Sequence, residues 1–172
     1  MIRRLFRREE KRASGPSPLP AGERAPDFRL QSDSGEPVIL GDLRGRPVVL
    51  VFYPEDNTSV CSSQLALYNE AYHLFAAHGA QFLGISVDDQ ASHRAFAKSL
   101  GLQFPLLSDD QPLGETARAY GVFDEKDQVA ERALFVLDAE GIVRWRYVAP
   151  RAVNPGANGI LDALESLTDE GA

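Results

Sequence analysis

Two short apolar runs constrain the fold of this chain more than any other feature. Residues 47–53 (PVVLVFY) and 82–87 (FLGISV) are rich in β-branched and aromatic residues and are apolar at successive positions. A strand that is apolar on both faces has to be covered on both faces, which is typical of the central strands of a sheet packed between other layers. We therefore expect a layered α/β domain.

An amphipathic helix is predicted between these two runs. Apolar residues recur at spacings of three or four positions from Leu65 to Phe75, which is the period of one helix face. Gly79 follows the last periodic residue, as glycine does at many helix ends. We predict one helix over about residues 58–78, and with it a strand-helix-strand unit.

The C-terminal half supplies the remaining elements. We expect a helix at 90–102, a short strand at 104–107, a short helix at 112–122, two strands within 133–148 and a helix at 158–167. Asp-Ala-Glu-Gly between the two late strands indicates a hairpin, so the sheet is mixed rather than parallel. A strand-helix-strand unit followed by a hairpin and a closing helix predicts an α/β thioredoxin-like fold, with a central mixed β-sheet flanked by helices.

Length and charge indicate a single acidic domain over residues 22–172. The chain has 172 residues, of which 44% are hydrophobic, and this is enough for one core. Its net charge is −7; residues 1–20 carry six Lys/Arg and two Asp/Glu, a net of +4, which leaves −11 for the rest. An acidic domain is not expected to bind nucleic acid.

Residues 1–21 are interpreted as a basic, disordered tail and a Pro/Ser linker. Arginines stand where a secretory signal would have them, but no apolar segment of about 7–15 residues follows. Ile2, Leu5 and Phe6 leave open a short helix on anionic lipid, although we do not expect membrane contact. No stretch approaches the roughly 20 apolar residues of a transmembrane helix. A single cysteine cannot form an internal disulfide, and a cytoplasmic location is expected.

The single cysteine, Cys61, falls at the start of the predicted helix. It precedes Leu65 by four residues and so continues the apolar stripe, which fits a buried, unreactive core cysteine. Asn57 and Thr58 are helix-capping residue types, so Cys61 also falls in the first turn, where unpaired N–H groups and the helix dipole favour an anion. An ordinary thiol is mostly protonated at neutral pH, and reactivity would need further groups that stabilise the thiolate. Both interpretations stay open on spacing alone.

Two neighbours could provide such help. Thr58 lies three residues before Cys61, on the same side of one helical turn, where its hydroxyl can donate to a thiolate or to a bound oxygen. Pro54 stiffens the turn after the strand and would help to shield the thiol from water; alternatively, it is an ordinary strand terminator.

These residues carry a resemblance to a known family. Pro54, Thr58 and Cys61 form Pro-x-x-x-Thr-x-x-Cys, which resembles the active-site motif of the peroxiredoxins of the AhpC/TSA family, in their bacterioferritin-comigratory-protein-like branch. Similar segments follow in the expected order: GERAPDF (22–28), LRGRPVVLVFYPEDNT (43–58), FPLLSDD (104–110), AYGV (119–122) and RALFVLDAEGIVR (132–144). The resemblance covers residues 22–168, nearly the whole predicted domain.

The resemblance implies roles for four residues. Cys61 would be the peroxidatic nucleophile, Thr58 would hydrogen-bond peroxide and sulfur, and Pro54 would shield them. Arg132 matches the family's active-site arginine, whereas taken alone it also fits an exposed charge at a strand edge. The implied function is a thiol-dependent peroxidase that reduces hydrogen peroxide and organic hydroperoxides through a cysteine sulfenic acid, without a metal or an organic cofactor.

Two positions depart from the family pattern. Many relatives carry a resolving cysteine five residues after the nucleophile, where this chain has Ala66, and a glutamate three residues after it, where this chain has Gln64. The chain is thus similar to a one-cysteine variant. We expect an external thiol as reductant, either thioredoxin, glutaredoxin or a low-molecular-weight thiol, and a monomer or weak homodimer.

Two other functions are weighed against this one. A peroxide-sensing or binding protein could use Cys61 as a redox switch without turnover. A cysteine hydrolase would need a histidine beside the thiol, but His73 would lie about 18 Å further along the predicted helix. His78 is farther still, and His93 could approach only through an unforeseen fold. The three histidines have no spacing typical of a zinc site and are interpreted as surface or partly buried residues.

Overall fold

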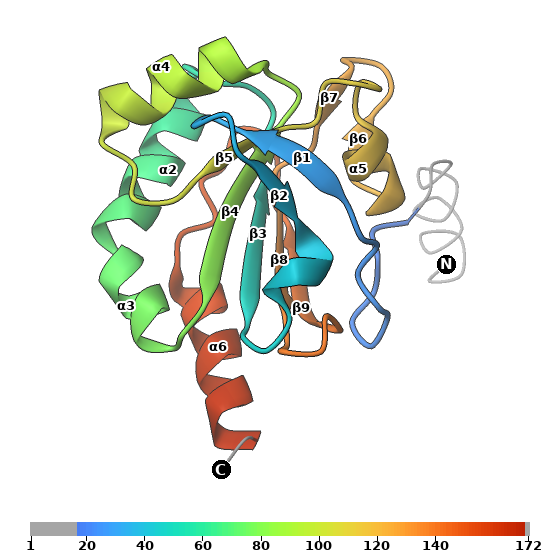
Figure 1. Cartoon of the computed structure of the whole chain (residues 1–172), viewed down its shortest axis with the longest axis vertical. Helices are drawn as coiled ribbons and strands as arrows, with labels where there is room; N and C mark the ends of the chain where they lie inside the picture. The colour runs from blue at the N-terminus through green and yellow to red at the C-terminus, as the bar shows by residue number, and fades with distance from the viewer. Residues whose placement is uncertain (1–16, 171–172) are drawn as a thin grey trace, which may run out of the picture.

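A seven-stranded sheet runs through the molecule in the order β2-β1-β5-β4-β3-β8-β9 (Figure 1). The structure, a computed structural model, describes residues 17–170. Its strands are β1 (Arg29–Ser32), β2 (Pro37–Ile39), β3 (Val48–Phe52), β4 (Gln81–Ser86), β5 (Leu106–Ser108), β8 (Ala133–Leu137) and β9 (Val143–Val148), with a separate hairpin of β6 (Phe123–Asp124) and β7 (Val129–Ala130). Its helices are η1 (Leu40–Leu43), α2 (Ser59–Glu70), α3 (Tyr72–Ala77), α4 (Gln90–Leu100), α5 (Glu115–Ala119) and α6 (Asn158–Glu170). Together these elements form the predicted thioredoxin-like arrangement.

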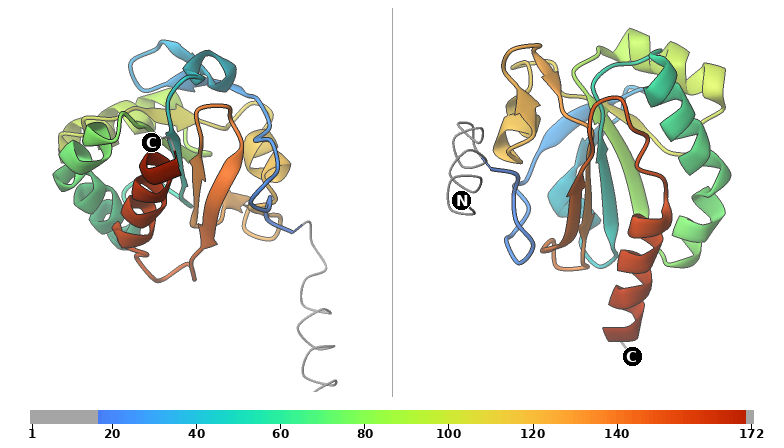
Figure 2. Two further views of the ribbon diagram at one scale, coloured as in Figure 1. Left: turned by 90° about the horizontal axis from the view of Figure 1, so that it is seen from below. Right: turned by 180° about the vertical axis from the view of Figure 1, so that it is seen from behind.

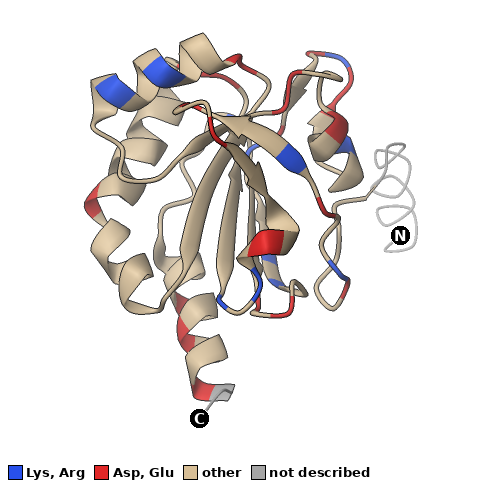
Figure 3. Ribbon diagram, viewed as in Figure 1, with Lys and Arg blue, Asp and Glu red and all other residues tan. Residues whose placement is uncertain are grey.

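Strand β3, which the apolar run at 47–53 predicted, lies inside the sheet between β4 and β8. It pairs in parallel with β4 and antiparallel with β8, and β8 continues antiparallel into β9. The sheet is therefore mixed, and the predicted late hairpin is confirmed. Every residue of β3 and of β8 is buried. The ribbon colouring shows no charged residue on β3 or β4, whereas charges lie in loops, on helices and on outer strands (Figure 3).

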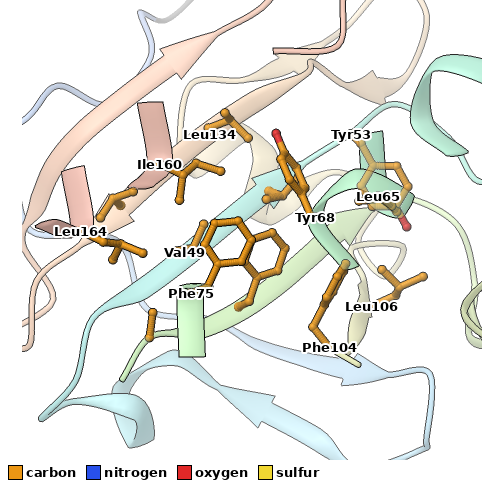
Figure 4. Packing of buried hydrophobic residues seen from close by; sticks show 14 of the residues in the cluster. Val49, Tyr53, Leu65, Tyr68, Phe75, Phe104, Leu106, Leu134, Ile160 and Leu164 are labelled. Atoms are coloured by element: carbon orange, nitrogen blue, oxygen red, sulfur yellow. The ribbon is translucent and has the colours of Figure 1, made fainter. Parts of the chain in front are cut away.

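Side chains from β3 enter two separate cores because successive residues point to opposite faces of the sheet. Val49 and Val51 pack with buried residues of α2, α3 and α6, among them Leu65, Phe75 and Leu164 (Figure 4). The second core takes its residues from the other face, namely Val48, Leu50, Phe52, Phe135, Leu137, Tyr120 and Val122. Helices α2, α3 and α6 lie on one side of the sheet, and α5 with the β6–β7 hairpin lies on the other (Figure 2). Strand β3 is thus packed on both faces.

The segment predicted as one helix over 58–78 is two helices. Ala71 separates α2 from α3, with φ −86° and ψ 0°. The second helix then places Phe75 against Phe82, with ring centroids 5.0 Å apart, and Tyr72 against Phe104 at 6.3 Å. The helical spacing located the apolar residues correctly, but the prediction of an unbroken helix is wrong.

The chain is already packed against the domain at residues 17–21, which were predicted to belong to the linker. The Leu19 amide donates to the Tyr120 carbonyl at 3.0 Å, and the Leu19 side chain packs against the second core. Gly121 has φ +70°, and a Cβ atom there would lie 2.2 Å from the Ser17 carbonyl oxygen. This part of the linker prediction is wrong because the segment finds both a hydrogen bond and an apolar contact.

The predicted basic tail at residues 1–16 lies outside the described residues. Within residues 17–170, no helix has the length and apolar character needed to cross a membrane.

The contact at Leu19 makes a prediction for truncated chains. Deleting residues 1–20 should lower the free energy of unfolding by about 1–2 kcal/mol relative to deleting residues 1–16, because only the longer deletion removes the Leu19 packing and hydrogen bond. This corresponds to a melting temperature roughly 2–8 °C lower, measurable by calorimetry. Equal melting temperatures for the two truncations would show that the contact contributes no stability.

Candidate active site

Cys61 lies in the first turn of α2, as the capping residues predicted. The helix begins at Ser59, and the Thr58 hydroxyl oxygen at its N-cap accepts from the Cys61 amide at 3.3 Å. A capping oxygen in this position satisfies one of the amides that a helix start leaves unpaired. The hydroxyl proton of Thr58 remains available for donation. Thr58 is partly exposed, whereas Pro54 is buried directly after β3.

The Cys61 side chain is fully buried, and it packs in the first core with Leu65 and Tyr68. This burial by itself fits the inert core cysteine as well as the nucleophile. The two interpretations are separated by what contacts the sulfur.

The contact to the sulfur comes from Arg132. Its Nη1 donates to Cys61 Sγ at 3.3 Å and to Gln64 Oε1 at 2.7 Å, and its Nε donates to the Arg151 carbonyl at 3.0 Å. The side chain is only 2% exposed. An exposed charge at a strand edge, the alternative left open by the sequence, does not fit this geometry.

Strand register explains how residues 71 positions apart meet. Phe52, the last residue of β3, pairs with Ala133, the first residue of β8. Arg132 directly precedes Ala133, so the antiparallel pairing places it beside the chain that leaves β3 toward α2. Sheet pairing thus brings the arginine to the thiol, although nothing in the local sequence of either residue specifies the contact.

The guanidinium of Arg132 forms no ion pair with a carboxylate among residues 17–170. Its hydrogen-bond partners there are a sulfur, an amide oxygen and a backbone carbonyl. A buried cation is costly unless an anion compensates it, and of these partners only the Cys61 thiol can become an anion. The positive charge of the guanidinium therefore lies next to the Cys61 sulfur. The first turn of α2 adds the positive end of its helix dipole at the same residue.

A hydrogen-bonded chain extends from Arg132 through Gln64 and Tyr68. Gln64 Nε2 donates to the Tyr68 hydroxyl at 3.1 Å, and that hydroxyl donates to the Gly156 carbonyl at 3.0 Å. Burial raises the pKa of Tyr68 to about 12, so the phenol keeps its proton and remains a donor. Tyr68 lies three residues after Leu65 in the apolar stripe, and such helical spacing carries no information about where a hydroxyl points.

Arg132 also borders an open pocket of about 440 Å³. The pocket is lined by Asp124, Glu131, Arg132, Ala149, Pro150 and Arg151. Arg132 thus contacts the buried Cys61 sulfur through its guanidinium and also lines this pocket.

The histidines divide into two kinds. His73 is exposed and His78 is partly buried, as predicted. The same prediction is wrong for His93, which is fully buried and lies 2.8 Å from an Asp56 carboxylate oxygen through its Nδ1. Its Nε2 lies 3.0 Å from the Leu107 carbonyl. Because both ring nitrogens are engaged, His93 is not available as a base for Cys61, which argues against the hydrolase alternative.

Replacing Arg132 tests its action on the sulfur. Arg132→Met should slow the second-order reaction of Cys61 with peroxide by at least about 100-fold, because it removes a charged donor from the reacting atoms. Arg118→Met, at an exposed arginine paired with Glu125, is the control and should react at the wild-type rate. Stopped-flow kinetics on protein shown to be folded by circular dichroism would measure both. An unchanged rate in Arg132→Met would refute the role.

Gln64 offers a test of the charge argument. Gln64→Glu places a carboxylate on the guanidinium, so the arginine no longer lacks a carboxylate partner and its attraction for the thiolate weakens. The thiolate absorbance at neutral pH should fall, and the peroxide reaction should slow by about three- to tenfold, or about 0.7–1.4 kcal/mol. Gln111→Glu adds the same charge at an exposed position and should change neither quantity. A faster reaction in Gln64→Glu would contradict the charge argument.

Comparison with known proteins shows which family this chain belongs to. Residues 21–146 match the AhpC/TSA family. Peroxiredoxin Q, chloroplastic, of Triticum aestivum is 39% identical over 127 residues, covering 73% of this chain and 58% of that protein. Peroxiredoxin 2 of Thermoplasma acidophilum is 34% identical over 152 residues, covering 85% of this chain and 75% of that protein. This chain thus spans 58% of the length of the Triticum relative and of the two from Oryza sativa that it matches.

Solved structures show the same similarity. The crystal structure of Enterococcus faecalis AhpC has a TM-score of 0.81 at 26% identity, covering 90% of this chain and 97% of that one. Peroxidoxin BcpB from Mycobacterium tuberculosis has a TM-score of 0.78 at 28% identity, covering 87% and 98%.

Proposed function

Since this chain belongs to the AhpC/TSA family, we propose that it is a thiol-dependent peroxidase that reduces hydrogen peroxide and organic hydroperoxides through Cys61. The observation that carries this proposal is the buried Arg132 guanidinium, which has the Cys61 sulfur at 3.3 Å and no carboxylate partner among the described residues. An inert core cysteine would not require a buried cation beside it.

The reaction moves two electrons from sulfur to the peroxide. The Cys61 thiolate attacks one peroxide oxygen, a sulfur–oxygen bond forms and the oxygen–oxygen bond breaks. The sulfur becomes a sulfenic acid, and the leaving hydroxide or alkoxide takes a proton to become water or an alcohol. Negative charge moves from sulfur to the leaving oxygen, so fixed donors along this line stabilise the transition state. No metal or organic cofactor takes part in the step.

The side chains around the sulfur fit these requirements. Arg132 stays protonated and carries several donors in a rigid fork, so it can contact sulfur and oxygen together. Thr58 already accepts from the Cys61 amide, which leaves its hydroxyl proton for a peroxide oxygen. Pro54 is buried two residues after the end of β3 and has no N–H to offer water. We propose these roles for the three residues.

The oxidised cysteine is reduced by a thiol from outside the chain. Cys61 is the only cysteine, and the position of a resolving cysteine is taken by Ala66. Its sulfur is fully buried, so two copies of Cys61 cannot pair without movement in both chains. A thioredoxin, a glutaredoxin or a low-molecular-weight thiol would form a mixed disulfide with Cys61, and a second thiol would resolve it. A monomeric or weakly dimeric state and a cytoplasmic location stay predictions.

The second candidate is a peroxide sensor that uses Cys61 without turnover. It is favoured by one observation, the absence of a second cysteine to complete the cycle within the chain. Turnover separates the two functions, because a sensor oxidises once and stops.

Peroxide consumption tests the proposal. Purified protein should consume many equivalents of peroxide when thioredoxin, glutaredoxin or a small thiol is supplied with its recycling system. Cys61→Ser should abolish consumption and keep the fold, since serine is similar in size but does not ionise at neutral pH. Without a thiol, one equivalent of peroxide should give a monomeric sulfenic acid by intact mass, with one trapping label per chain at Cys61.

Three results would contradict parts of this scheme. Activity in Cys61→Ser would rule out the nucleophile. A single oxidation without turnover in any of the thiol systems would favour the sensor. A stoichiometric disulfide-linked dimer before any thiol is added would show that the cycle runs between subunits.

A further inference from the structure

A second buried polar cluster lies beside the segment that leads from β3 into α2. Its centre is Asp56, which is 5% exposed, between the fully buried Tyr53 and His93. Asp56 accepts from the Tyr53 hydroxyl at 2.7 Å, from the Ser92 hydroxyl at 2.8 Å and from His93 Nδ1 at 2.8 Å. The peroxidase mechanism uses none of these side chains, and burying so many polar groups in a small domain is costly unless they are all paired.

Hydrogen bonding assigns the protons on His93. Its Nε2 faces the Leu107 carbonyl at 3.0 Å, and a carbonyl can only accept, so this nitrogen carries a proton. Its Nδ1 faces an Asp56 oxygen, and the carboxylate accepts from two hydroxyls as well. Both ring nitrogens therefore donate, and His93 and Asp56 form a buried imidazolium–carboxylate ion pair.

The charges around His93 agree with this assignment. Burial lowers the pKa of His93, but the hydrogen bond and charge of Asp56, the charge of Asp88 and the bond to Leu107 outweigh it, so the pKa lies above its ordinary value. The other ionisable neighbour is Tyr53, whose pKa is raised well above its ordinary value by burial and by Asp56. The phenol stays neutral and acts as a donor. The groups facing His93 thus comprise two carboxylates, a phenol, a hydroxyl and a carbonyl.

The same cluster is unsuited to a metal ion. Asp56, Asp88 and His93 offer ligand atoms within 4.8 Å of one another. However, His93 Nδ1 is bonded to Asp56, and one Asp88 oxygen accepts from the Asp56 amide at 2.9 Å and from the Ser86 hydroxyl at 2.5 Å. The cation of this cluster is the protonated imidazole.

The ion pair is anchored where the catalytic segment turns. Asp56 is bonded through its side chain to His93 of α4 and through its amide to Asp88. The next residue, Asn57, has φ +66°, in the left-handed region that asparagine adopts more readily than other non-glycine residues. Thr58, the N-cap that accepts from the Cys61 amide, follows directly.

We propose that His93 and Asp56 are positioning residues for the reaction of Cys61, because their ion pair holds residues 54–58 in the conformation that places the Thr58 hydroxyl at the Cys61 amide. The proposal rests on the proposed peroxidase function for its peroxide readout. It also makes the nucleophilicity of Cys61 depend on the protonation of a histidine in another helix.

The sign of the pH dependence follows from the raised pKa. A group whose pKa is higher in the folded state stabilises that state fully below its unfolded value, about 6.5 for histidine, and this contribution is lost as pH rises through the folded value. The Cys61 reaction rate should therefore fall as pH rises above about 6.5 and through the raised folded-state pKa of His93.

A double-mutant cycle tests the positioning role. His93→Gln, Asp56→Asn, the double variant and the control His73→Gln, at an exposed histidine, would be compared with wild type. Two rates are measured across the pH range, alkylation of Cys61 by iodoacetamide and its reaction with hydrogen peroxide, together with melting temperature. His93→Gln should slow both rates by about ten- to 100-fold at neutral pH. In this variant the rates should no longer fall as pH rises through the pKa of His93. The double variant should be no slower than either single variant, and His73→Gln should match wild type.

The two readouts separate this proposal from the proposed function. Slowed alkylation in His93→Gln supports positioning even if no variant reacts with peroxide, a result that would overturn only the peroxidase. Wild-type rates and pH profile in folded His93→Gln, with only the melting temperature lowered, would reduce the ion pair to a structural role and overturn the proposal.

A measurement on the wild-type protein covers the case in which the variants do not fold. Nitrogen-15 resonances of the His93 ring should show both nitrogens protonated at neutral pH. The pH midpoint of the His93 titration should coincide with the pH at which the rate of Cys61 alkylation falls. A neutral His93 ring at neutral pH, or alkylation that passes this midpoint without a change, would overturn the proposal.

Discussion

The contact between the Arg132 guanidinium and the Cys61 sulfur governs how the rest of the site is arranged. A cation that is only 2% exposed has to be compensated, and its hydrogen-bond partners include no carboxylate in the part of the chain that the structure describes. Gln64 supports the guanidinium without neutralising it, and Tyr68 in turn fixes Gln64. Because Gln64 and Tyr68 are uncharged, the positive charge of the Arg132 guanidinium stays directed at the sulfur.

This contact depends on the sheet more than on the helix that carries the cysteine. The register between β3 and β8 pairs Phe52 with Ala133, and a slip by one residue would turn Arg132 to the opposite face. Side chains of β3 pack into cores on both faces, which makes such a slip unfavourable. The packing that stabilises the fold therefore also sets the distance between the Arg132 guanidinium and the Cys61 sulfur.

Much of this arrangement could be predicted from local patterns. The runs that became β3 and β4 were visible because strands covered on both faces are continuously apolar, and the capping types at Asn57 and Thr58 located the start of α2. Resemblance to a family then singled out Arg132, which local sequence alone could not do. Three features escaped prediction, since they depend on partners distant in sequence. They are the break at Ala71, the burial of His93 against Asp56, and the docking of Leu19 beside Tyr120.

The break at Ala71 has a consequence for access to the sulfur. Because α2 and α3 are separate helices, the aromatic contacts that Tyr72 and Phe75 make with Phe104 and Phe82 belong to α3. Segments with few shared contacts can open as separate cooperative units, at a lower free energy than global unfolding. The start of α2 is held by its own buried residues, Cys61 and Leu65, and Tyr68 further along α2 contacts Phe75 and Phe82 with ring centroids 6.2 and 5.4 Å apart. Because the Cys61 side chain is fully buried, a molecule can contact the sulfur only after the start of α2 or its neighbours move.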